Sequence, residues 1–233
     1  MLSDAEWQAI FISLRVAVTA VGGILIPGVA LAWLMARHEF RGKALLDGIL
    51  HLPLVLPPVV VGYLLLISLG RQGWLGQWLD SWFGVTLPFT WQGAAVAAGV
   101  MAFPLLVRAV RLSLEAVDVN LEAAASTLGA NRWRVFFTIT LPLALPGLLT
   151  GTVLAFARAL SEFGATITFA ANIPGETRTL PLALYTLIQT PGAEAAAARL
   201  CVISIIIAML SLIASEWLAR LARRRLSERD SQR

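Results

Sequence analysis

The chain interrupts its apolar runs with one long half-polar stretch, 122-EAAASTLGANRWRVFFTITLPLALPG-147. Before this stretch and in its first part, apolar residues recur at spacings of three and four, which is typical of one face of a helix. These residues are Leu114, Val117, Leu121, Ala124 and Leu128. Gly129 then suits a left-handed helix end, and Asn131 suits the first cap of a new helix. The pattern predicts a helix, a glycine turn and a second helix, presented as one rigid amphipathic unit.

Outside this stretch the composition indicates a membrane protein. Of 233 residues 58% are hydrophobic and only 14% are charged, with a mean hydropathy of +0.77. A membrane-spanning helix needs about 20 apolar residues to cross roughly 30 Å of hydrocarbon. Prolines inside such helices are expected to bend them. We expect an all-α bundle of about five spans, at 16–36, 48–70, 81–107, 135–157 and 200–215.

The uncharged segment 179–193 is a sixth candidate for a span. Pro181 and Pro191 leave only about a dozen residues between them that can form a continuous helix, which is short for a membrane crossing. We therefore expect a re-entrant or interfacial helix here, with a sixth span as the alternative.

The distribution of lysine and arginine predicts the orientation, because these residues are enriched in cytoplasmic segments. With the N-terminus outside and the C-terminus inside, most of the basic residues lie on the inner side. The inner segments then hold Arg37, Arg41, Lys43, Arg108, Arg111, Arg132, Arg134, Arg220, Arg223, Arg224, Arg225, Arg229 and Arg233, and the outer segments hold only Arg71, Arg178 and Arg199. The formal charge of +4 then reflects a basic face that meets anionic lipid, and nucleic acid is not an expected partner.

The sequence offers no motif for catalysis or for binding ATP. A phosphate-binding loop ends in Gly-Lys-Ser/Thr, but Gly42 and Lys43 are followed by Ala44. The two histidines, His38 and His51, have no Cys or carboxylate at metal-ligand spacing, and the single Cys201 cannot form an internal disulfide. We expect no cofactor, no metal site and no enzymatic activity, so any energy source must belong to another chain.

The half-polar stretch also resembles a known family. Glu122, Ala123 and Ala124 are followed by Gly129, nine residues and then 139-ITLP-142, a spacing similar to that of the integral-membrane subunits of bacterial ABC importers. Members usually place the glutamate six residues before the glycine, where this chain has Ala123. The resemblance implies a type I-like importer permease in which segment 112–142 is a cytoplasmic coupling loop to a separate ATPase subunit. The coupling residues it implies are Glu122, Ala123, Ala124, Gly129, Ala130, Arg132, Trp133, Ile139, Leu141 and Pro142.

Within that family the segments 44–66, 132–143 and 161–192 look like those of molybdate permeases. This implies a single transmembrane permease domain over 1–233 in the bacterial inner membrane. The implied partners are a second copy of the chain, two copies of a cytoplasmic ATP-binding subunit, a periplasmic molybdate-binding protein and membrane lipid. A sulfate or tungstate permease is the alternative of the same class, and a stand-alone secondary transporter or channel is the alternative of another class.

An anion pathway should offer hydroxyls, backbone amides and positive charge, and should bind only weakly so that the anion can leave. Arg158 and Glu162 are four residues apart, so they can pair on one helical face. We expect the pathway to involve Arg158, Ser161, Glu162, Thr166 and Thr168. The alternative is structural, with the ions neutralising each other and the hydroxyls bonding back to helix carbonyls.

Overall fold

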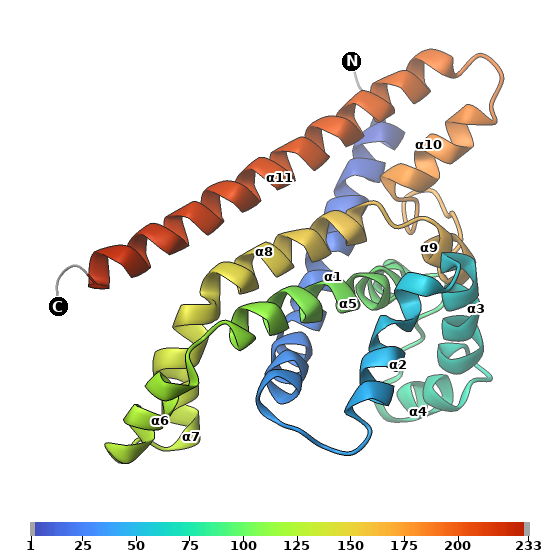
Figure 1. The fold of residues 1–233 in the computed structure, drawn as a ribbon. Helices are drawn as coiled ribbons and strands as arrows, with labels where there is room; N and C mark the ends of the chain where they lie inside the picture. Colours follow the sequence, from blue (N-terminus) through green and yellow to red (C-terminus); the bar gives the residue numbers. More distant parts are fainter. Residues whose placement is uncertain (1–2, 231–233) are drawn as a thin grey trace.

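A computed structural model describes residues 3–230, and the regular elements among them are all helical (Figure 1). The helices are α1 (Asp4–Arg37), α2 (Lys43–Val55), α3 (Pro58–Leu69), α4 (Trp74–Phe83), α5 (Trp91–Glu115), α6 (Val119–Thr127), α7 (Arg132–Val135), the π-helical turn η1 (Phe136–Thr140), α8 (Leu141–Leu160), α9 (Gly164–Phe169), α10 (Leu180–Ile188) and α11 (Glu194–Asp230). The all-α prediction is confirmed.

The core lies where α5 packs between α1 and α8. Much of it consists of small residues, such as Ala98 and Ala102 on α5 and Ala17 and Ala155 on its neighbours, all fully buried. In membranes small side chains let helix backbones approach closely, and packing then replaces the hydrophobic effect as the main attraction between helices. The alanines and glycines of α5 therefore explain why it is the central helix.

Within residues 3–230, four helices are long and apolar enough to cross a membrane: α1, α5, the continuous helix Arg132–Leu160 and the segment Glu194–Ala214 of α11. They contain the predicted spans at 16–36 and 135–157 and all but the last residue of the span at 200–215. The predicted start of the third span, residue 81, is wrong. Gly84 ends α4 in the left-handed region, and the Thr90 hydroxyl accepts a hydrogen bond from the Gly93 N–H at 3.1 Å, so α5 begins only at Trp91.

The predicted second span, 48–70, is not one straight helix. It consists of α2 and α3, which meet at an angle of 114°. The break follows from Pro57 and Pro58, because a proline has no N–H to continue the helix and disfavours helical backbone at the residue before it. The part of the chain that the structure describes therefore has four candidate spans, or five if this bent pair counts as one.

Contacts at the two ends of the bundle agree with an odd number of crossings. At one end Arg199, near the start of α11, lies 3.1 Å from Glu6 near the start of α1. At the other end Arg111 of α5 lies 3.2 Å from Asp47 of α2. The start of α1 thus lies beside the start of α11, whose far end is on the opposite side of the molecule (Figure 1).

Helix α10 has nine residues and is about 13 Å long at 1.5 Å per residue. It is too short to cross the bilayer, in agreement with the predicted re-entrant or interfacial helix.

The basic run 223–225 lies on α11, but its side chains are outside the described part of the chain. Residues 1–2 and 231–233 of the predicted domain are also outside it.

Gly62 makes the contact between α3 and α9 possible. A Cβ atom at Gly62 would lie 2.7 Å from the Ala165 carbonyl oxygen and 2.9 Å from the Ala165 Cα, and backbone atoms cannot turn aside. We expect Gly62→Ala to destabilise the protein by about 1–3 kcal/mol through overpacking, measured as a lower melting temperature in detergent. Gly22→Ala on α1 is the matched control, because nothing lies within 4 Å of its Cβ position. Equal melting temperatures for the two variants would contradict this packing.

Candidate functional site

The predicted helix, glycine turn and helix lie together at one end of the molecule (Figure 1). Gly129 has φ +86°. Its N–H donates to the Ser126 carbonyl at 3.0 Å, and the Ala130 N–H donates to the Ala125 carbonyl at 3.1 Å. This pair of bonds is the Schellman arrangement, which closes a helix and requires a left-handed residue after its end. The Asn131 side chain accepts from the Arg134 N–H at 2.8 Å and begins α7. Both predicted caps are confirmed.

The predicted continuous apolar face from Leu114 to Leu128 is wrong in one respect. Helix α5 ends at Glu115 and α6 starts at Val119. The Asp118 side chain accepts from the Asn120 N–H at 2.9 Å and caps the new helix. Leu114 and Val117 are therefore buried in the core, whereas Leu121 and Leu128 lie on the surface of a separate helix.

Large apolar side chains are exposed on the surface formed by α6, α7 and η1. Leu128 is 89% exposed, Trp133 68% and Phe137 59%. Large apolar side chains gathered on one surface indicate a binding face. Of the residues predicted to couple to an ATPase subunit, five are exposed, namely Ala123, Ala124, Gly129, Arg132 and Trp133, and five are partly buried, namely Glu122, Ala130, Ile139, Leu141 and Pro142.

Aromatic side chains hold this face against the end of α1. Trp33 of α1 stacks on Trp133 with ring centroids 6.4 Å apart, and meets Phe136 edge to face at 5.8 Å. A cavity of about 500 Å³ lies beside them. Its lining includes Arg37 of α1, Glu122 of α6 and Arg132 of α7. The second helix of the unit is therefore fixed to α1 by packing.

Glu122 is engaged within its own chain. Its Oε1 atom lies 2.7 Å from the Arg37 Nη2 and accepts a 2.7 Å hydrogen bond from the Thr140 hydroxyl. Arg37 and Thr140 were not predicted as site residues, because they are 85 and 18 residues away from Glu122 in sequence. The sequence predicts for Arg37 only a place among the basic residues of the inner segments. The sequence held one unusual feature here, the one-residue displacement of Glu122 from the family spacing.

At the opposite end of α8 the predicted pair of Arg158 and Glu162 is present. The Arg158 Nη1 lies 2.6 Å from the Glu162 Oε2, and Glu162 is 2% exposed. The other carboxylate oxygen accepts from the Ala165 N–H at 2.8 Å. Glu162 lies just after the end of α8, so the pair joins α8 to the start of α9.

The three predicted pathway hydroxyls do not form one cluster on the fourth span. Ser161 follows the last residue of α8 and donates to the Arg158 carbonyl at 3.1 Å. Thr166 and Thr168 belong to the separate short helix α9. Thr166 is buried, and Thr168 donates to the Gly164 carbonyl at 2.8 Å. For Ser161 and Thr168 the structure shows the local bonding that was the alternative reading.

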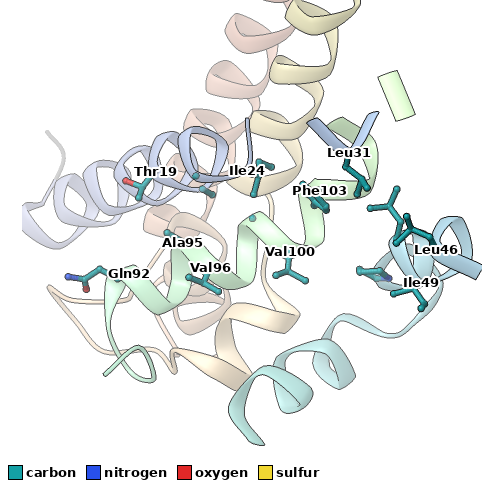
Figure 2. A pocket seen from close by; sticks show the side chains of 15 residues that line it. Thr19, Ile24, Leu31, Leu46, Ile49, Gln92, Ala95, Val96, Val100 and Phe103 are labelled. Carbon is teal, nitrogen blue, oxygen red and sulfur yellow. The ribbon is translucent and has the colours of Figure 1, made fainter. Parts of the chain in front are cut away.

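A mostly apolar cavity with a volume of about 630 Å³ lies between α1, α2 and α5. Figure 2 shows Thr19 and Gln92 toward one end and Leu31, Leu46 and Ile49 toward the other. An anion needs donors that replace its hydration shell, and the lining offers few. This cavity is suited to apolar side chains or acyl chains, and it contains none of the predicted pathway residues. Among the described side chains, no group of three or more His, Cys, Asp or Glu residues could hold a metal ion.

The helical bundle and the candidate spans among its described residues indicate a membrane protein that crosses the bilayer several times. The chain belongs to the family described as binding-protein-dependent transport system inner membrane component, whose model matches residues 28–228. It is thus a permease component of an ABC importer in the inner membrane, and ATP hydrolysis takes place on a separate subunit.

The similarity extends to individual proteins. The chain is 67% identical over 225 residues to the molybdenum transport system permease protein ModB of Escherichia coli (strain K12), covering 97% of this chain and 98% of that protein. It is 39% identical to the sulfate transport system permease protein CysW of Synechococcus elongatus, over 91% of this chain and 75% of that one. The fold is similar, with a TM-score of 0.71 and 18% identity, to a chain of a bacterial ABC transporter involved in the import of alginate, covering 96% and 80% of the two chains.

Proposed function

We propose that this permease moves molybdate, received from a periplasmic molybdate-binding protein, into the cytoplasm. The observation that carries the proposal is the 67% identity over nearly the whole length of a molybdenum permease, together with an exposed apolar coupling face. Sulfate is the second candidate, because a sulfate permease is 39% identical and both anions are tetrahedral dianions.

We propose that segment 112–142 docks into a groove of the ATP-binding subunit. An amphipathic helix that lays its apolar side chains into a groove is a common mode of recognition. Leu128, Trp133 and Phe137 supply the apolar contacts, and the exposed Arg132 supplies positive charge at the rim. The flanking residues Glu122, Ala123, Ala124, Gly129, Ala130, Ile139, Leu141 and Pro142 keep these side chains in position or border them.

We propose that two copies of the chain form the complete pathway and that each binds one ATP-binding subunit. Helices α2 and α3 carry large apolar side chains on their surface, with Val55 81% exposed, Leu45 70% and Tyr63 56%. A second copy and membrane lipid are the two expected neighbours of such a face. The bend at Pro57 and Pro58 leaves backbone groups that need partners in a membrane, which favours placing this face at the pathway between copies.

We propose that the anion passes near the junction of α8 and α9. Arg158 is partly exposed there, and Ser161 is exposed beside it, so one positive charge and one hydroxyl are accessible. Glu162, Thr166 and Thr168 lie behind them and shape the junction. Because Glu162 neutralises much of the Arg158 charge, the site is weak, as a transport pathway requires.

Reconstitution tests the proposed function. The permease is expressed with its ATP-binding subunit, purified through a tag on the permease and placed in liposomes with the binding protein. We expect co-purification of the two subunits, and stimulation of ATP hydrolysis and uptake by molybdate-loaded binding protein above the unloaded form. Stronger stimulation by sulfate-loaded binding protein would mean that sulfate, and not molybdate, is the substrate. Anion movement by the permease alone would show a stand-alone transporter instead.

A further inference from the structure

Three elements meet at the carboxylate of Glu122. The Arg37 guanidinium, at the last residue of α1, donates from Nε at 3.2 Å and from Nη2 at 2.7 Å to Glu122 Oε1. The same oxygen accepts from Thr140 at the end of η1. Arg37 Nη2 also donates to the Val117 carbonyl at 3.3 Å, in the link between α5 and α6. We call these three side chains, Arg37, Glu122 and Thr140, the inner tie.

The inner tie is shielded from solvent. The side chain of Arg37 is 13% exposed, that of Glu122 20%, and Thr140 is 1% exposed as a residue. Charged hydrogen bonds in such a place are stronger than surface pairs, because less water competes for the donors and less salt screens the charges. Removal of one member leaves a partly buried charge without its partner, which is more costly than the loss of a surface ion pair.

Helix α6 has little else to hold it. The structure describes all nine of its residues, and none is buried. A helix without a buried face gains little from apolar packing, and a nine-residue helix is not stable by itself. Helix α6 also lies close to α7 and η1, and the side-chain hydrogen bonds that join it to α1 are those of the inner tie.

We propose that Glu122 acts inside the permease and not on the ATP-binding subunit: through the inner tie it makes α6 move as one body with α1 and α8. Glu122, Arg37 and Thr140 are therefore positioning residues for coupling. The proposal rests on the proposed docking of segment 112–142. On this proposal, a displacement of α6 reaches α1 directly through Arg37. It also reaches α8 through η1.

The arrangement of the core explains why this route matters. Helix α1 packs along α5 and also contacts α8, so a displacement of its inner end is passed to the central helices by close-packed side chains. Thr140 occupies the last position of η1, where the Leu141 N–H donates to the Phe136 carbonyl five residues back. Such π-helical turns often occur at functional sites in helices. The inner tie thus connects the docking helix to two core helices at their inner ends.

The test compares side-chain variants by the number of anions transported per ATP hydrolysed, with molybdate-loaded binding protein in liposomes. We expect Glu122→Gln and Arg37→Gln each to lower this ratio about tenfold, and the double variant to be no worse than Arg37→Gln, because partners in one interaction are not additive. Thr140→Val should lower the ratio about threefold and Thr140→Ser should leave it unchanged, since only the valine removes the hydroxyl while keeping the shape. All variants should still co-purify with the ATP-binding subunit.

The control is Glu39→Gln, which removes an ion pair with Lys43 near the same end of the molecule, where the Glu39 side chain is 88% exposed. It should change nothing, because exposed pairs contribute little. Loss of the ATP-binding subunit from the Glu122→Gln variant alone would overturn the proposal, since Glu122 would then contact that subunit. Multiplying effects in the double variant, or an unchanged ratio in the single variants, would also overturn it. A wild-type permease that binds no ATP-binding subunit would instead refute the proposed function.

Discussion

Replacement of Gly129 by valine is expected to abolish uptake while the protein remains in the membrane. Gly129 has φ +86°, a backbone conformation that a β-branched residue avoids. The change costs about 1–3 kcal/mol if the conformation is kept, and otherwise opens the Schellman turn that sets the angle between α6 and α7. The spans do not depend on this turn, so insertion should be normal. The measurement is uptake and binding-protein-stimulated ATP hydrolysis at equal permease content.

Two milder variants separate backbone strain from steric contact. No atom of the chain lies within 4 Å of a Cβ atom placed on Gly129. Asparagine tolerates the left-handed region better than alanine does, but its side chain is larger. We therefore expect Gly129→Asn to retain more uptake than Gly129→Ala. The opposite order would mean that the ATP-binding subunit packs tightly on the glycine, and normal uptake in Gly129→Val would contradict a role for the turn in coupling.

Replacement of Arg158 by glutamine should have the second large effect. Glu162 is 2% exposed and loses its cationic partner. Breaking a buried ion pair by removing one member costs about 3–5 kcal/mol. Because the Arg158 side chain is 24% exposed, we expect the lower end of that range, seen as a lower melting temperature in detergent and a loss of uptake.

The double variant, Arg158→Gln with Glu162→Gln, is the matched control. It removes the unpaired charge and keeps an acceptor for the Ala165 N–H, so thermal stability should largely return. Uptake should remain below that of the wild type if the positive charge of Arg158 assists the anion. Full recovery of both properties would give the pair a purely structural role and would remove Arg158 from the proposed pathway.

Local features of the fold could be predicted because their causes are local. The cap at Asn131, the left-handed Gly129 and the pairing of Arg158 with Glu162 each depend on residues within four positions. The start of α5 was misplaced by ten residues because residues 84–90 are apolar enough to resemble a span, although Gly84 and Thr90 mark the ends of two helices. Two adjacent prolines indicated a break in the 48–70 span, but they did not indicate how large the bend is.

The candidate site was predictable in its position and less so in its chemistry. The family spacing locates the segment around Gly129, but it cannot show which way the Glu122 carboxylate points. Its partners, Arg37 and Thr140, come from other elements, and no periodicity connects residues 85 positions apart. The π-helical turn that precedes Pro142 is equally hidden, because its residues read as ordinary helix. Long-range polar contacts of this kind become visible only when the helices are placed together.

The exposed apolar face of α6, α7 and η1 has a consequence for how the transporter is assembled in the cell. On the proposed docking, a newly inserted permease exposes Leu128, Trp133 and Phe137 until an ATP-binding subunit covers them. Exposed apolar patches of this kind promote aggregation, and unassembled chains that expose them are removed by cellular proteases. On the proposed docking, the supply of the ATP-binding subunit therefore sets how much permease accumulates, so the two subunits need to be synthesised together.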